Sequence, residues 1–159
     1  MPFPSTRVIP KDWSAHHQRV VEGAFNARMM ITDPSRTLPG EWDPDTGTYG
    51  PPTPFIVAGG PSDARVDWRT GVPCRIQQNK DERAIEQADQ ALVIRLYLIQ
   101  FPVDIPLFEV GFVGTVTDCP NDPLFEGEQL VVSDRMHGSE AFNRDLVWIH
   151  NQKPEVLNG

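Results

Sequence analysis

The sequence has few cysteines, no long apolar run and no cluster of basic residues. Its 159 residues include two cysteines, Cys74 and Cys119, which lack CxxC spacing. A disulfide framework or a thiolate metal site is therefore not expected, and both are predicted to be small core residues. No segment has the length and apolarity that cross a bilayer, and the N-terminus has no signal-peptide pattern. We expect a soluble protein made in the cytoplasm, with no membrane contact.

Positive charge is also scarce. Lys and Arg number 14 against 22 Asp and Glu, which gives a net charge of −8 and a pI near 4.9. Proteins that grip nucleic acid by its phosphates need clustered Lys and Arg to displace counterions. The composition therefore argues against tight DNA or RNA binding, although an acidic wall would let a duplex slide past.

Recognisable catalytic motifs are absent from the sequence. It contains no GxSxG, HExxH, P-loop or GxGxxG pattern. His16 and His17 are neighbours, and side chains one residue apart on a helix point about 100° apart, so they do not easily share a metal. His137 and His150 are isolated in the sequence. We predict that the protein is no enzyme and has no cofactor or metal.

A short helix is predicted over residues 12–23. Asp12 or Ser14 can cap its start, and Gly23 stands where a C-terminal cap belongs. Two or three turns are marginally stable alone, so the helix must dock on its own domain or on a neighbouring subunit. The candidate docking face consists of Trp13, His17, Val20 and Val21.

A strand with period-two alternation is predicted over residues 24–32, followed by a long loop. Residues 33–71 contain seven prolines and six glycines and show no sustained period. A segment of this kind is a mobile insertion or a functional loop, and the pattern leaves both open. Its four aromatic residues are candidate contacts to a partner or to a channel lumen: Trp42, Tyr49, Phe55 and Trp68.

Five more short strands are predicted, over residues 72–79, 91–101, 112–117, 130–135 and 144–149, with residues 80–90 as a turn or an exposed strand end. Short strands at this spacing without intervening helices indicate a barrel or sandwich. We predict one all-β domain over residues 1–159, a small β-barrel of about six strands. The predicted core includes Leu92, Ile94, Leu96, Leu98, Val116, Leu130, Val132 and Leu146.

Short motifs follow one another in a characteristic order along residues 13–149. They begin with WSAHH (13–17), VEG (21–23), DPDTGT (43–48) and GVPCRIQ (71–77), and continue through residues 97–102, 110–111, 121–123, 130–132, 138–139 and 144–146. In this order the chain resembles the small head–tail joining proteins of long-tailed phages that infect actinobacteria. It departs from them at Phe112, where related chains have Asp after Gly, and in the extra length of residues 50–70.

The resemblance implies a head-completion or stopper protein of the virion. Such a protein is a small β-barrel that assembles into a homo-oligomeric ring, of six copies, at the head–tail junction. The portal adaptor would lie on one side and the tail terminator or tail tube on the other. The loop 33–71 would project toward the channel, and packaged DNA would be held back or pass through without specific binding.

Other functions stay open at this point. An adaptor should be mainly helical, and a tail terminator should mix helices with a sheet. A nucleic-acid-binding barrel of the OB type should carry aromatic residues beside Lys and Arg along its strands, and here Tyr97 and Arg95 are an isolated case. An enzyme of unfamiliar type would need convergent polar groups.

Overall fold

A computed structural model describes residues 12–87, 90–136 and 143–150, and the side chains of residues 14 and 79–94 lie outside this description. Helix α1 (Trp13–Glu22) comes first, as the sequence predicts. Nine strands follow within the described residues: β1 (Ala27–Leu38), β2 (Trp42–Asp43), β3 (Thr48–Tyr49), β4 (Thr53–Ala58), β5 (Val72–Gln87), β6 (Gln90–Phe101), β7 (Val113–Asp118), β8 (Gln129–Arg135) and β9 (Arg144–His150). Two 3-10 turns, η1 (Val66–Trp68) and η2 (Pro123–Phe125), interrupt the connections.

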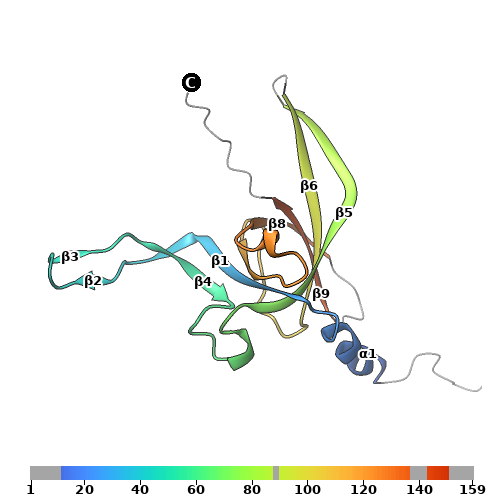
Figure 1. Cartoon of the computed structure of the whole chain (residues 1–159), viewed down its shortest axis with the longest axis horizontal. Coiled ribbons are helices and arrows are strands. Elements are labelled where there is room, and N and C mark those ends of the chain that lie inside the picture. Colours follow the sequence, from blue (N-terminus) through green and yellow to red (C-terminus); the bar gives the residue numbers. More distant parts are fainter. Residues whose placement is uncertain (1–11, 88–89, 137–142, 151–159) are drawn as a thin grey trace, which may run out of the picture.

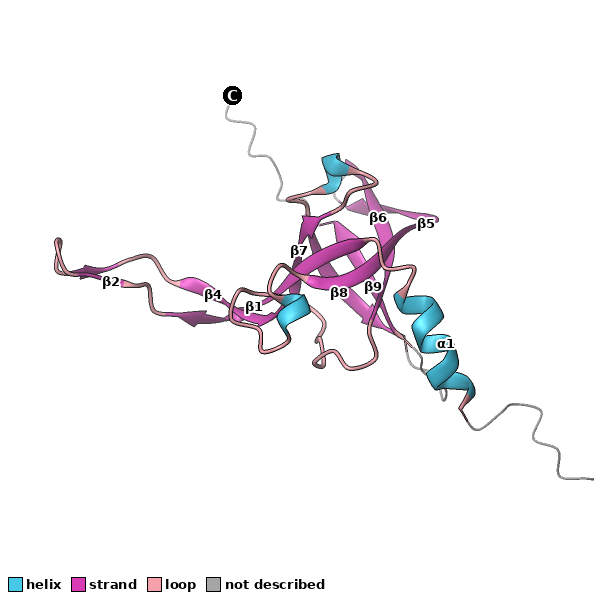
Figure 2. Ribbon diagram, turned by 60° about the horizontal axis from the view of Figure 1, so that its bottom comes forward, coloured by secondary structure: helices cyan, strands magenta, loops and turns pink. Residues whose placement is uncertain are grey.

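Six strands close into an antiparallel barrel (Figures 1 and 2). The strand order is β4-β1-β5-β6-β9-β8-β7, and pairing of β1 with β7 closes the cylinder. Arg28 to Thr32 of β1 face Asp118 to Val113 of β7 at this seam. β4 is an additional strand that pairs with β1 outside the closed barrel. The prediction of a six-strand β-barrel with a short N-terminal helix is confirmed.

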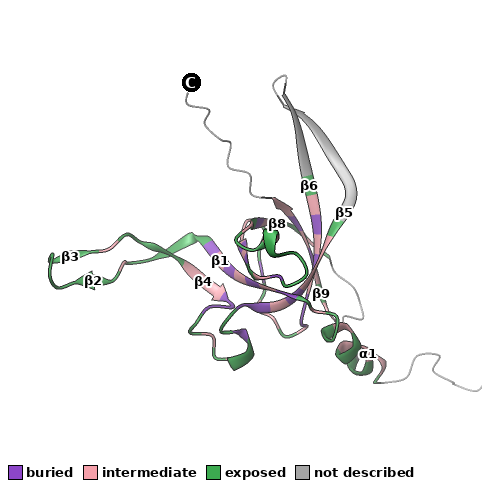
Figure 3. Cartoon of the chain, in the orientation of Figure 1, coloured by how far each residue is buried: buried purple, intermediate pink, exposed green. Residues whose placement is uncertain are grey.

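The barrel is filled by aromatic and aliphatic side chains, and its interior is the buried region in Figure 3. Trp148 and Phe101 are fully buried, with ring centroids 6.0 Å apart, and Phe108 meets Phe101 edge-on at 5.4 Å. Gly114 faces this cluster so closely that a Cβ would lie 2.8 Å from the Trp148 ring. The predicted core residues Val116, Leu130, Val132 and Leu146 are all buried.

The predicted buried face of β6 is wrong. Leu96 and Leu98 are only half-buried, whereas Tyr97, Ile99 and Phe101 point inward; the side chains of Leu92 and Ile94 lie outside the description. A one-residue change of phase moves every side chain of a strand to the opposite face. Both faces of β6 are apolar in sequence, so the alternation alone did not tell the inward face from the outward one.

Three elements leave the barrel in different directions (Figure 1). One is α1. The second is the hairpin of β5 and β6, which remain paired as far as Gln87 and Gln90, so of the two predicted alternatives, turn or strand end, residues 80–87 form strand. The third begins where β1 and β4 leave the barrel and ends at the small β2–β3 sheet; it is named here the arm (residues 34–57).

Residues 33–71 are therefore not the structureless loop that their prolines and glycines indicated. The first strand continues to Leu38, six residues beyond its predicted end, and pairs with β4 in the register Leu38 to Thr53. The register is irregular between Ile31 and Thr32 and again between Asp33 and Thr37. Asp33 is buried and accepts hydrogen bonds from the backbone N–H and the hydroxyl of Ser35. Local capping of this kind lets a strand bend away from a barrel without losing its pairing.

Residues 59–71 are held against the barrel wall. The Arg28 guanidinium donates to the carbonyl oxygens of Asp67 and Gly71, at 2.6 and 3.1 Å. The Thr117 hydroxyl donates to the carbonyl of Thr70 at 2.8 Å. Trp68 is 5% exposed and belongs to the core. This half of the predicted loop is thus part of the folded body.

A substitution at Gly71 tests whether residues 59–71 are packed against the barrel. Its φ of +126° is rarely adopted by L residues, and a Cβ would lie 2.4 Å from the Thr117 hydroxyl and 2.9 Å from Arg28 Cβ. We expect Gly71→Ala to lower the free energy of unfolding by at least about 2 kcal/mol, measured by urea denaturation. The matched control is Gly47→Ala, where φ is +65° but nothing lies within 4 Å. Equal losses at the two positions would contradict the close packing of residues 59–71.

Candidate interaction surfaces

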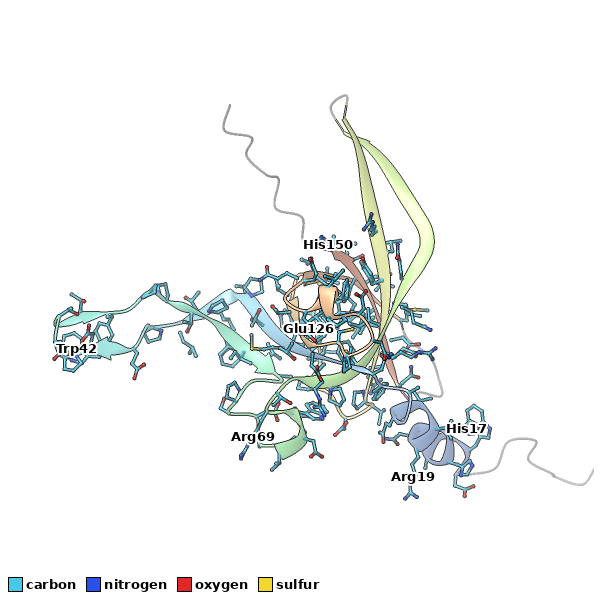
Figure 4. The ribbon with its side chains drawn as sticks, in the orientation of Figure 1. His17, Arg19, Trp42, Arg69, Glu126 and His150 are labelled. Atoms are coloured by element: carbon cyan, nitrogen blue, oxygen red, sulfur yellow. The ribbon has the colours of Figure 1, made fainter. Side chains whose placement is uncertain are left out.

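The tip of the arm presents an aromatic pair and three carboxylates. Trp42 on β2 and Tyr49 on β3 are directly opposite, with ring centroids 4.9 Å apart in an edge-to-face arrangement. They are 50% and 68% exposed, and Trp42 marks the far end of the arm in Figure 4. Glu41, Asp43 and Asp45 lie in the same segment of the chain, and no basic residue lies within 41–49. The tip is consequently both apolar and negatively charged.

The turn at the tip is well defined. The backbone N–H of Gly47 donates to the Asp43 carbonyl at 2.9 Å. The Asp43 carboxylate accepts from the Asp45 backbone N–H and the Thr46 hydroxyl, both at 2.9 Å. These hydrogen bonds stabilise the charged form and hold the pKa of Asp43 below its usual value. The Asp-Pro-Asp-Thr-Gly segment thus forms a turn that joins β2 to β3 and fixes the orientation of the aromatic pair.

The other two candidate aromatics are placed differently. Phe55 lies on β4 at the base of the arm, half-buried, with the Arg36 guanidinium 3.9 Å above its ring. Trp68 lies in the core, covered by the Arg65 guanidinium at 3.4 Å, and Arg65 in turn pairs with Asp63 at 3.1 Å. The inclusion of Trp68 among candidate contact residues is therefore wrong. The Arg65 guanidinium covers one face of the Trp68 ring, and the rest of the side chain packs in the core.

Helix α1 extends from the barrel at the start of the described chain. Apart from isolated approaches, no described strand contacts it. His17 and Trp13 stack at 4.1 Å, with His17 Nδ1 2.9 Å from the Trp13 carbonyl oxygen, and Figure 4 shows His17 and Arg19 on the projecting helix. Of the candidate docking face, Val20 is left open to solvent, while Trp13, His17 and Val21 are half-buried.

An apolar stripe crosses the outside of the barrel. Leu96 lies opposite Ile149, Leu98 opposite Val147, and Val131 opposite both Ile149 and Val113. Directly opposed residues of antiparallel strands project from the same face. All six aliphatic side chains of this outer stripe are half-buried in the isolated chain. This surface is the reason why the inward face of β6 was misassigned.

A groove opens at the end of the barrel where β9 begins. It has a volume of about 190 Å³. Phe108 and Leu146 form its buried floor, Leu107 and Met136 are 67% and 56% exposed at its rim, and Arg135 and Arg144 flank it. Arg144 donates to the Val103 carbonyl at 3.3 Å, and neither arginine forms an ion pair with a residue that the structure describes. Burial raises the pKa of Asp145, which lines the same groove.

A larger and more polar cavity of about 490 Å³ lies at the other end of β9, beneath η2. His150 Nε2 is 2.5 Å from a Glu128 oxygen, and Tyr97 and Phe125 face each other at 5.5 Å. His150 Nδ1 and the Trp148 indole N–H are buried and have no hydrogen-bond partner among the described residues. A His–Glu pair can move a proton, but a nucleophile or second carboxylate hydrogen-bonded to it is not seen among the described residues.

The described residues include no cluster of three or more His, Cys, Asp and Glu side chains arranged to hold a metal ion. No helix within the described ranges has the length and apolarity needed to span a membrane. Cys74 and Cys119 are buried and unpaired, and burial raises the pKa of the Cys74 thiol, so that it stays protonated.

Sequence reasoning found the tip aromatics and the helix face, but missed the groove and the outer stripe. The groove joins residues 105–108 to residues 135–136 and 144–146, which are brought together only by barrel closure. A sequence signal existed for the stripe alone, because Leu96, Leu98, Val147 and Ile149 lie on strands with two apolar faces.

Comparison with curated proteins found no match, and comparison with solved structures found none either. One family model matches residues 17–149, from α1 to the end of β9. The matched region contains the barrel, the arm and the groove. The chain therefore belongs to DUF6093, a family of unknown function.

Proposed function

We propose that the protein is a structural subunit of the head–tail connector of a long-tailed phage, acting as a stopper ring below the portal and its adaptor. The observation that carries the proposal is the arm: an ordered hairpin whose β2–β3 tip exposes aromatic and acidic residues and makes no more than isolated approaches to any other described element. The motif order along residues 13–149 supplies the connector context.

Projecting elements of this kind need partners. Helix α1 has ten residues and makes no more than isolated Cα approaches to the described strands, and helices of this length are marginal in isolation. Apolar groups left in water in a contiguous patch usually mark a contact surface, and the outer stripe adds such a patch. A protein with contact surfaces on several sides of a small body suits a ring with neighbours above, below and beside each copy.

The arm is long enough to act at a distance. From Asp33 to Asp43 the chain covers ten residue steps, which span about 33 Å at strand spacing. In a ring, arms of this reach can extend toward the channel or across a neighbouring subunit. The function is then steric closure and docking of the tail, without bond chemistry, and the site of action is the virion.

The barrel architecture favours a stopper over the other connector components. An adaptor is expected to be mainly helical and a tail terminator to mix helices with a sheet, whereas the described part of this chain has one ten-residue α-helix and a closed barrel. An OB-type reader of nucleic acid needs Lys and Arg beside its aromatics. The tip instead carries three carboxylates beside Trp42 and Tyr49.

The proposal is tested with a phage that lacks the gene for this chain. We expect heads that package DNA and then lose it, together with free tails, as seen by electron microscopy and nuclease sensitivity. Mass spectrometry of purified wild-type virions should find the chain. Normal tailed particles from the null phage, or virions without the chain, would refute the connector role.

The isolated protein is expected to bind DNA weakly and without sequence preference. Its net charge of −8 repels a phosphate backbone, and ordinary non-specific binders already have Kd values of about 10⁻⁴–10⁻⁶ M at physiological salt. A gel-shift titration at physiological salt measures this. Sub-micromolar binding would contradict a passive conduit and favour a nucleic-acid-binding barrel.

A further inference from the structure

We infer that the arm tip of one copy of the chain occupies the groove of the next copy, so that neighbouring subunits are joined by an aromatic contact between flanking charges. The inference rests on the proposed assembly into a ring, and it specifies which two surfaces meet.

The groove has the size and lining for an aromatic side chain. Its volume of about 190 Å³ exceeds the roughly 150 Å³ of a cavity that holds a benzene ring. Six of its nine lining residues are apolar, with Phe108 and Leu146 as a floor. The Trp42–Tyr49 pair is the exposed aromatic pair that the described chain offers. Trp and Tyr are also the residue types that most often anchor protein interfaces.

The charges of the two surfaces are complementary. The tip carries Glu41, Asp43 and Asp45, and the groove is flanked by Arg135 and Arg144 with Asp145 as its one acidic residue. Opposite charges around an apolar centre set orientation and accelerate association. The Arg135 side chain has no hydrogen bond or ion pair within the described chain, so its guanidinium is available to a carboxylate of another copy.

The tip does not fill the groove of its own barrel. β2 and β3 contact each other, and neither makes more than isolated approaches to any other described element. The arm points away from the barrel in both ribbon views (Figures 1 and 2). Because tip and groove are different surfaces of one chain, their contact is head-to-tail, and such contacts generate rings when the rotation closes.

Cysteine cross-linking tests the contact directly. Thr48→Cys on the tip and Met136→Cys on the groove rim are exposed, whereas the native thiols are buried. Mixing the two single variants at high concentration with a short bis-maleimide should give a covalent dimer. The control replaces Met136→Cys by Leu124→Cys, which is 90% exposed at the opposite end of the barrel. Equal yields with the control, or no dimer with Met136→Cys, would overturn the inference.

Charge reversal is a second test of the contact. Association is measured by sedimentation velocity, and also by the cross-linking yield when the charge variants carry Thr48→Cys or Met136→Cys. Arg135→Glu with Arg144→Glu should weaken association at least about 10-fold, as should Glu41→Arg with Asp45→Arg. A chain carrying all four changes should regain association, because the signs are again complementary. Failure of the fourfold variant to recover would count against the pairing. Detection of the chain in virions without tip-to-groove cross-links would reject this contact and leave the connector role intact.

Discussion

Deleting residues 41–49 is expected to abolish particle assembly while leaving the barrel as stable as the parent. The backbones of Gly40 and Gly50 touch at the base of the tip: a Cβ on Gly40 would lie 2.1 Å from the Gly50 carbonyl oxygen. Joining these glycines leaves five residues between the paired Leu38 and Thr53, a common hairpin loop length. Thermal melting should shift by no more than a few degrees, and a null phage supplied with the variant should yield no tailed particles.

Two controls separate the possible causes. Replacing residues 41–49 by nine Gly and Ser residues keeps the length but removes the aromatic and acidic side chains, and it should fail in assembly as the deletion does. Deleting residues 50–70 instead removes β4 and Trp68, which belongs to the core, and should prevent folding. Normal infectivity of the 41–49 deletion would show that the tip is a tolerated insertion.

Replacing Ile99 with alanine is expected to lower the free energy of unfolding by about 2–5 kcal/mol, the usual range for a large-to-small change in a packed core. Ile99 is fully buried and lies opposite Leu146 inside the barrel. The neighbouring change Leu98→Ala removes a side chain of the same size from the half-buried outer face. In dilute solution Leu98→Ala should lower the free energy of unfolding by less than about 1 kcal/mol. Urea denaturation of both variants gives the comparison.

Repeating the urea denaturation of both variants at increasing protein concentration tests whether the outer stripe is covered by another subunit. If the stripe is covered by another subunit, the loss caused by Leu98→Ala should grow as copies associate, because folding is then linked to assembly. The loss caused by Ile99→Ala is expected at every concentration. Equal losses for the two variants in dilute solution would contradict the assigned phase of β6.

The sequence carried enough information for the barrel because its strands have short, repeated alternation and clear turns. The strand limits at β7, β8 and β9 were predicted within one residue of those observed. The arm was missed because Pro34, Pro39 and Pro54 indicate a loop when read one by one. Pro54 is tolerated because β4 is an edge strand, and Pro34 because it lies in the irregular stretch of β1 between Asp33 and Thr37; both are properties of the folded sheet.

The candidate site was predictable only where single residues carry the signal. Exposed aromatics in a polar turn identified Trp42 and Tyr49, but the same rule wrongly included Trp68. Whether Trp68 faces water depends on Arg28 and Thr117, which lie 40 or more residues away and hold its segment to the barrel. The groove depends on closure in the same way, since Leu107 and Arg135 become neighbours only in the fold.

The position of β4 at the edge of the sheet also bears on aggregation. An exposed edge strand is a template onto which further chains can add their own strands. Pro54 lies within β4 and Pro51 and Pro52 precede it, and proline has no backbone N–H to donate to an incoming strand. The prolines therefore reduce the number of hydrogen-bond donors that β4 can offer to an added strand. In the proposed connector role the chain would accumulate before it meets its neighbours, and these prolines would then oppose amyloid-like growth while its exposed surfaces remain available for specific contacts.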